Sequence, residues 1–182
     1  MKAKTQILTK IITTAIILFT ISCASQKKIV TVGDKEIYMQ EMYTSLIAEL
    51  SHEAEVAIVE DSIKVIFFNG ISFNVNETTI RKEFYPYFKR FAKVLNQYLN
   101  TTILITGHAD STGDKKTNIE ISQKRADNAK NILQNFDVKE ERIYTLGHGA
   151  TLPLSNNNTL AGRAKNRRIE FVILYNYDNN KK

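Results

Sequence analysis

The chain has 182 residues, of which 43% are hydrophobic and 24% are charged, a composition typical of globular proteins and not of disordered or fibrous ones. Its single cysteine excludes an intrachain disulfide and a cysteine-based zinc site. The net charge of +6 falls to +3 when the three lysines of the first 22 residues are set aside, and so small a charge argues against a nucleic-acid-binding protein.

Residues 1–22 show the pattern of a secretory signal peptide, with lysines first, then an apolar run at 11–21, then Ser22. The apolar run is shorter than the roughly 20 residues of a membrane-spanning helix, although an uncleaved anchor is the alternative. Cys23 follows directly and resembles the lipidated cysteine of a bacterial lipobox, with Thr20 in place of the usual Leu. We expect Cys23 to carry lipid, including palmitate, and to begin the mature chain. An incidental thiol behind an ordinary signal peptide is the other interpretation.

The segment 23–54 is expected to hold the lipidated N-terminus, a short polar tether and one helix. The apolar residues that recur at helical spacing are Met39, Met42, Tyr43, Leu46, Ile47 and Leu50. We expect this helix to pack on the main domain, and an exposed helical stalk is the alternative.

Two runs rich in β-branched and aromatic residues come next, at Glu55–Val59 and Ile63–Phe68. The turn-forming residues between them predict a β-hairpin. An apolar helical stripe follows, and its helix is expected to begin at about 84–86, because Pro86 is tolerated in a first turn and not in a helix interior.

The second half of the chain alternates strand and helix patterns. In chain order these are a strand at 102–106, a loop at 107–116, a helix at 117–135, a strand at 143–146, a loop at 151–160 and a closing strand at 168–175. Such alternation predicts an α+β or α/β fold. We expect the α+β class, with helices packed on one face of a mixed β-sheet, as a βαβαβ core plus an N-terminal hairpin.

Three motifs in this half carry a family resemblance. They read GHADSTG over 107–113, NIEISQKRA over 118–126 and GRAKNRRIE over 162–170. They resemble the OmpA-like C-terminal domain, whose pattern is a G-H-T-D-x-x-G loop, an N-x-x-L-S-x-x-R-A helix and a G-R-A-x-N-R-R-V-E strand. This domain is the peptidoglycan-binding module of peptidoglycan-associated lipoproteins, outer-membrane porins and flagellar stators. The resemblance covers about residues 55–176, expected as one domain, with a polar tail at 177–182.

The chain departs from the family pattern at a few positions. Ala109 stands where the family usually has Thr, which removes one hydroxyl from the expected site. Asn74 replaces a common Asp, and Ile121 replaces Leu. The resemblance still implies the same fold and peptidoglycan binding, with a ligand that is held less strongly.

The ligand that the resemblance implies is the diaminopimelate of the peptidoglycan stem peptide, whose free end carries one ammonium and one carboxylate. Asp110 can accept from the ammonium, and the planar guanidinium of Arg125 can hold the carboxylate. We expect both side chains to be partly exposed at the mouth of the pocket. Asn118 can supply amide hydrogen bonds. By resemblance, Arg167 points into the same pocket and Asn76 completes its rim.

The resemblance therefore implies a binding protein and not an enzyme, with no cofactor and no metal. Its expected partners are peptidoglycan, the outer membrane through the lipid anchor, and further envelope proteins, but not nucleic acid. It would tether the outer membrane of a Gram-negative cell envelope to the wall from the periplasmic side. The alternative is an envelope hydrolase or metal-dependent enzyme that uses the loops of His108, Asp110 and His148. A flagellar stator is disfavoured, because the run at 11–21 has neither the length nor the acidic residue of its membrane helix.

Overall fold

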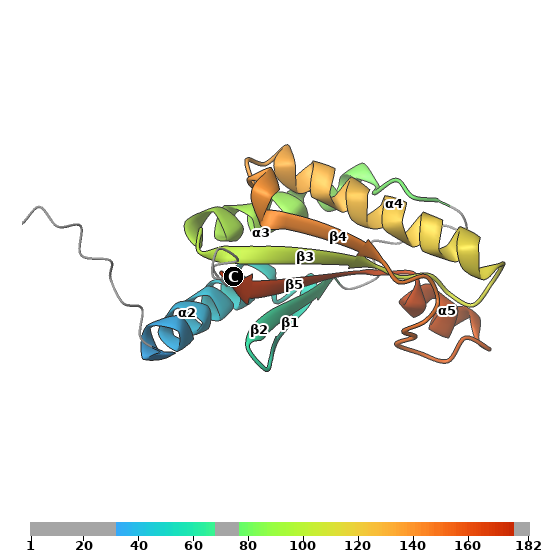
Figure 1. Ribbon diagram of the computed structural model, residues 1–182, viewed down its shortest axis with the longest axis horizontal. Helices are drawn as coiled ribbons and strands as arrows, with labels where there is room; N and C mark the ends of the chain where they lie inside the picture. The colour runs from blue at the N-terminus through green and yellow to red at the C-terminus, as the bar shows by residue number, and fades with distance from the viewer. Residues whose placement is uncertain (1–31, 68–76, 177–182) are drawn as a thin grey trace, which may run out of the picture. The chain divides into compact units, whose positions relative to one another are not determined.

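A mixed β-sheet with strand order β1-β2-β5-β3-β4 runs through the computed structural model, which describes residues 32–67 and 77–176 (Figure 1). Its strands are β1 (Ala54–Val59), β2 (Ser62–Phe67), β3 (Thr101–Gly107), β4 (Ile143–Gly147) and β5 (Ile169–Tyr175). The expected signal peptide, the tether with Cys23, the positions of Asn74 and Asn76, and the polar tail lie outside the described residues.

The pairing of the strands shows why the sheet is mixed. Strands β1 and β2 form the predicted antiparallel hairpin, with Glu60 at its turn in the left-handed region at a φ of 51°. Strand β3 is parallel to β4 and antiparallel to β5. A parallel pair needs a long crossover, which α4 (Lys115–Gln134) supplies. The predicted α+β class and mixed sheet are confirmed.

Three helices, α2 (Val32–Leu50), α3 (Tyr85–Gln97) and α4, cover one face of the sheet. Alternate strand residues point to this face and are buried, as the two-residue period of a strand requires. The buried side chains of sheet and helices include Ile103, Ile105, Phe171, Ile173, Met42, Phe88, Phe91, Ala126 and Leu133. Helix α3 begins at Tyr85 with Pro86 in its first turn, as predicted, after a short 3-10 helix, η2 (Lys82–Phe84).

Helix α2 shares the core of the sheet domain. Its residues Met42, Leu46 and Leu50 are fully buried, and each such side chain contributes about 1.5–3 kcal/mol. Near its N-terminal end the Tyr38 hydroxyl accepts from the backbone N–H of Asn100 at 3.0 Å. Its C-terminal end leads directly into β1. Helix α2 is therefore not an exposed stalk. No helix of the described ranges is long and apolar enough to cross a membrane.

The C-terminal motif differs from its prediction as a strand. Its first half forms a short helix, α5 (Leu160–Asn166), and β5 begins only at Ile169. Thr159 caps this helix, because its hydroxyl accepts from the backbone N–H of Gly162 at 3.0 Å. A side chain at Gly162 would lie 1.9 Å from the carbonyl oxygen of Asn156, so glycine is needed there. The predicted closing strand at 168–175 agrees with β5 to within one residue. The helix before it was not predicted, because a seven-residue helix is too short to show a hydrophobic period.

Candidate functional site

A pocket of about 140 Å³ lies where β3 ends and α4 begins. The residues that line it are Ala109, Asp110, Thr112, Gly113, Asn118, Ile121, Arg125 and Arg167. The structure thus brings Ala109, Asp110, Asn118, Arg125 and Arg167, five of the six predicted binding residues, to one pocket. The sixth, Asn76, lies outside the described residues.

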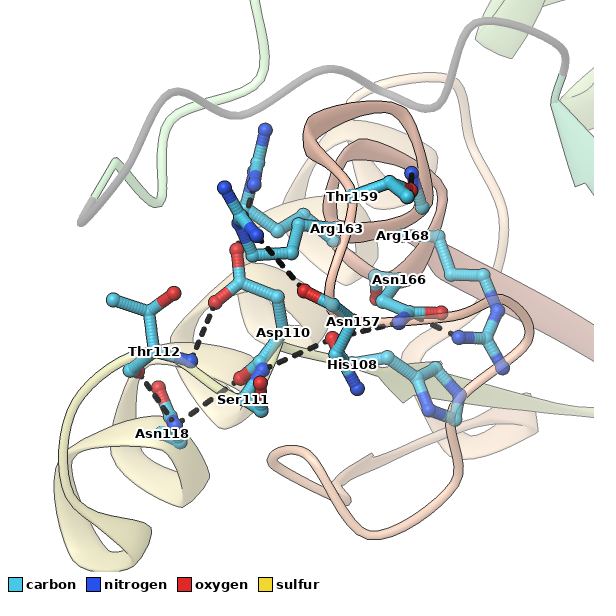
Figure 2. A network of polar contacts seen from close by, with 12 residues as sticks. His108, Asp110, Ser111, Thr112, Asn118, Asn157, Thr159, Arg163, Asn166 and Arg168 are labelled. Atoms are coloured by element: carbon cyan, nitrogen blue, oxygen red, sulfur yellow. Dashed lines mark hydrogen bonds and ion pairs between the residues drawn. The ribbon is translucent and has the colours of Figure 1, made fainter.

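Backbone contacts fix the loop that carries Asp110. The N–H of His108 donates to the carbonyl of Arg168 at 2.9 Å, and that of Ala109 donates to the carbonyl of Gly149 at 2.8 Å. Helix α4 lies close to this end of β3, because a Cβ at Gly107 would be 1.9 Å from the Ser122 carbonyl oxygen. Asn118, in the first turn of α4, therefore faces the loop (Figure 2).

Asp110 is a buried carboxylate with two well-placed donors. Its Oδ2 accepts from Arg167 Nη1 at 2.6 Å, and its Oδ1 accepts from the Thr112 N–H at 2.8 Å. Burial alone would raise the pKa of Asp110, but the hydrogen bonds from Arg167 and Thr112 lower this pKa below its ordinary value. Asp110 is therefore ionised at neutral pH and can accept from a ligand cation.

Arg125 is the most deeply buried cation of the pocket, at 1% exposure. Its Nε donates to the carbonyl of Glu77 at 2.9 Å, and its Nη1 donates to that of His108 at 3.2 Å. Burial, with a further contribution from Arg167, lowers the pKa of Arg125 to about 10, so that it remains a cation at neutral pH. Glu77 directly follows Asn76 in the chain.

The expectation that Asp110 and Arg125 are partly exposed is wrong, because Asp110 is only 5% exposed and Arg125 only 1%. Their bonds to backbone N–H and carbonyl groups hold both charges inside the protein. A ligand would therefore meet them within the pocket. A bidentate contact through Nε and Nη1 of Arg125 would compete with the two carbonyls that these atoms already serve.

Asn118 and Arg167 have contacts of their own within the site. The amide Nδ2 of Asn118 donates to the carbonyls of Asp110 and Thr112 at 3.2 and 3.0 Å, so this side chain holds the loop in shape. Arg167 reaches the pocket from the end of α5 and forms an ion pair with Asp110, while its side chain keeps 20% of its surface exposed.

The two histidines near the pocket stack on each other, with His108 buried and His148 half-buried. His108 is 2% exposed, its ring stacks on that of His148 with centroids 5.3 Å apart, and its Nε2 lies 3.2 Å from Thr106 Oγ1. Burial, with a contribution from the cation of Arg168, lowers the pKa of His108 to about 4, so the ring is neutral at neutral pH. Arg168 in turn forms an ion pair with Glu170 at 2.6 Å.

This arrangement bears on the alternative of an enzyme. The Asp110 carboxylate bonds to Arg167 and Thr112, whereas the His108 ring lies with Thr106 and Glu170. Of the three residues named for that alternative, His108 and His148 stack on each other, whereas Asp110 has other partners. Among the residues that the structure describes, no group of three or more His, Cys, Asp or Glu side chains is placed to hold a metal ion.

Two asparagines with no role predicted from the sequence, Asn166 and Asn157, also have contacts at the site. Asn166 is fully buried and bonds to the backbone of Leu154 and Ser155, and Asn157 reaches the pocket loop (Figure 2). Asn166 belongs to the GRAKNRRIE motif, and Asn157 lies shortly before that motif in the chain. Spacing alone, however, gives no indication of which backbone groups an asparagine meets.

More than half of the chain matches the model of one protein family. The model of the OmpA family matches residues 72–167, which include the loop of Asp110, helix α4 and the whole of α5. The chain belongs to the OmpA family. The match extends over more than half of the chain.

Proteins that are similar to this chain in sequence include lipoproteins and porins. The chain is 28% identical to the peptidoglycan-associated lipoprotein of Buchnera aphidicola, over 86% of this chain and 89% of that protein. It is 33% identical to the probable lipoprotein YiaD of Escherichia coli, over 62% of this chain and 52% of that protein. It is 36% identical to outer membrane porin F of Pseudomonas fluorescens, over 57% of this chain. The match spans only 32% of that porin and 29% of Omp38 from Acinetobacter baumannii.

Solved structures show the same fold at lower identity. The cell wall anchor of the T6SS from Pseudomonas aeruginosa matches with a TM-score of 0.61 at 24% identity, over 76% of this chain and 97% of that chain. The peptidoglycan-associated lipoprotein from Burkholderia pseudomallei matches with a TM-score of 0.54 at 24% identity, over 56% of this chain and 86% of that chain. The predicted resemblance to the OmpA-like domain is confirmed.

Proposed function

We propose that this protein binds peptidoglycan non-covalently through the diaminopimelate of the stem peptide, as a lipoprotein that links the outer membrane to the cell wall. The observation that carries the proposal is the pocket, in which the anion Asp110 and the cation Arg125 face one small space. Relatives in the OmpA family add support, since one of them, similar over 86% of this chain, is named a peptidoglycan-associated lipoprotein.

The chemistry of the pocket matches a zwitterion. Asp110 accepts from the ligand ammonium while it keeps its bond to Arg167, and Arg125 donates to the ligand carboxylate. Each charge-assisted hydrogen bond contributes roughly 1.5–3 kcal/mol. Two or three such bonds correspond to micromolar-class binding. Asn118 keeps the loop in place, and we propose that Asn76 and Ala109 complete the wall of the site.

Binding of the full chain, in detergent, to purified sacculi tests this proposal. Free diaminopimelate is expected to compete, and Asp110→Asn is expected to weaken binding about tenfold through the loss of the carboxylate charge. Lys124→Ala is the matched control, since Lys124 is exposed on the same helix and its removal is expected to leave binding unchanged. Equal binding to diaminopimelate-type and lysine-type walls would overturn the proposed recognition of the carboxylate.

We propose further that a lipid on Cys23 anchors the chain in the outer membrane, with the binding domain in the periplasm. Several acyl chains together give stable anchoring, whereas one is marginal. Cell fractionation tests this directly, because Cys23→Ala is expected to move the protein from the membrane to the soluble periplasmic fraction. A variant that stays in the membrane fraction with its leader attached would contradict the anchor.

A further inference from the structure

Two asparagine side chains hold the two ends of a single peptide unit in the pocket loop. The carbonyl oxygen of Asp110 accepts from Asn118 Nδ2 at 3.2 Å. The N–H of Ser111, the other end of the same peptide, donates to Asn157 Oδ1 at 3.2 Å. Asn118 comes from α4 and Asn157 from the segment before α5, and Figure 2 shows the loop between them.

Other contacts fix Asn157 in turn. Its Oδ1 also accepts from Nδ2 of the fully buried Asn166 at 2.8 Å, and its carbonyl accepts from Arg163 Nη1 at 2.8 Å. The Oδ1 of Asn166 accepts from the backbone N–H groups of Leu154 and Ser155, both at 2.8 Å. The acceptor that meets Ser111 is therefore held by helix α5 and by its own loop.

The 110–111 peptide lies in the turn between the Asp110 carboxylate and the Thr112 N–H that donates to it. The carboxylate bonds to the Thr112 N–H one peptide further on and to Arg167, and both contacts depend on how the chain turns between Asp110 and Thr112. Rotation of the 110–111 peptide would shift the carboxylate relative to Arg125. Asn157 is not one of the residues that line the pocket. Any effect of Asn157 on a ligand therefore acts through the loop that carries Asp110.

We propose that Asn157 is a positioning residue for Asp110: it fixes the 110–111 peptide, and thereby the carboxylate that accepts from the ammonium of a zwitterionic ligand. This inference rests on the proposed function. The competing interpretation is that Asn157 only stabilises the loop before α5. The two interpretations differ in whether the effect of Asn157 on binding depends on Asp110.

Calorimetric titration of the full chain in detergent with free diaminopimelate provides the first test. Asn157→Ala is expected to lower affinity about tenfold, because the Ser111 N–H loses its acceptor and the carboxylate its fixed direction. Asn157→Asp keeps an acceptor of the same shape and is expected to restore affinity. Asn158→Ala, an exposed neighbour in the same loop, is the control. Asn157→Ser, whose shorter side chain falls short of Ser111, is the second variant should the alanine variant fail to fold.

A double-mutant cycle provides the decisive readout. In an Asp110→Asn background, Asn157→Ala is expected to change affinity little, because the carboxylate that it positions is gone. The same tenfold loss in both backgrounds would overturn the inference in favour of a merely structural role. Wild-type affinity of Asn157→Ala, with the wild type binding, would overturn the inference alone. A wild type that binds neither sacculi nor diaminopimelate would overturn the proposed function, and the inference with it.

Discussion

Two buried arginines lie at opposite ends of β3, and their surroundings differ. Arg142, in the 3-10 helix η3 (Glu140–Arg142), lies at the start of the strand, and Arg125 lies at its end. Arg142 donates to the carbonyls of Leu95, Tyr98 and Thr101 at 3.0, 2.9 and 2.9 Å, and to Thr101 Oγ1 at 2.7 Å. It thereby joins the end of α3 to the start of β3.

Arg125 has the same kind of backbone contacts but a different neighbourhood. It lines a pocket together with a carboxylate and a second guanidinium, whereas Arg142 donates to three backbone carbonyls and one hydroxyl. Burial lowers the pKa of both arginines. Burial and satisfied hydrogen bonds therefore do not distinguish a structural arginine from the binding arginine that we propose. The two differ in that Arg125 lines a pocket together with the carboxylate of Asp110.

The largest expected effect on stability is at Arg142, at the start of β3. Arg142→Ala removes a donor from three carbonyl groups, of which that of Tyr98 keeps its bond from Thr101 Oγ1, and we expect a loss of about 4 kcal/mol in the free energy of unfolding. Urea denaturation measures this loss, and Glu141→Ala, an exposed neighbour, is expected to have almost no effect. Because the pocket lies at the other end of β3, the folded fraction is expected to bind diaminopimelate normally. Unchanged stability would show that Arg142 does not hold α3 to the sheet.

A smaller effect on stability is expected at Arg125, at the end of β3 beside the pocket. Arg125→Lys keeps the charge but loses the planar guanidinium, so stability is expected to fall by about 1 kcal/mol while affinity for diaminopimelate falls tenfold or more. Paired denaturation and titration measurements check both quantities. If stability fell by as much as in Arg142→Ala and affinity did not change, Arg125 would be a second structural arginine and the comparison would fail.

The smallest effect at neutral pH is expected at His108, whose carbonyl accepts from Arg125. The pKa of the His108 ring is lowered to about 4, so the unfolded chain binds its proton more readily. This contribution to stability is complete above about pH 6.5 and is lost as the pH falls toward 4. Arg168, Glu170, His148 and Lys64 face the ring, and the lowered pKa of Glu170 adds a loss that begins near the ordinary glutamate pKa of about 4.5 and continues at more acidic pH.

His108→Gln is expected to remove the part of the pH dependence between 6.5 and 4. Urea denaturation at pH 7, 5.5 and 4.5 follows it, and His52→Gln is the control because His52 is exposed on the surface. The same slope in wild type and His108→Gln would contradict the assignment to this ring.

Sequence patterns predicted the local elements and the composition of the pocket well. The hairpin follows from two β-rich runs with a turn between them, and the start of α3 follows from Pro86. Asp110 lies in the loop after β3, and Arg125 lies near the middle of α4, the next helix along the chain. Their assignment to one pocket came from the resemblance of the three motifs to the OmpA-like domain.

Contacts between distant segments were beyond the reach of sequence reasoning. The burial of Arg125 depends on the carbonyl of Glu77, 48 residues away, and the role of Arg142 depends on the carbonyl of Leu95. No local pattern marks either carbonyl as an acceptor. For the same reason, the sequence around Arg142, in a short connecting turn, does not indicate that this arginine is buried against the end of α3.

The direction of α2 has a mechanical consequence. Its N-terminal part lies beside Asn100, at the start of β3, and its C-terminal end joins β1 near the residues that pair with the end of β2. The pocket lies at the other end of β3. A pull between the first residues of α2 and a ligand in the pocket would therefore act along the strands. Such a load shears many interstrand hydrogen bonds at once, whereas a load across the strands would unzip them one by one.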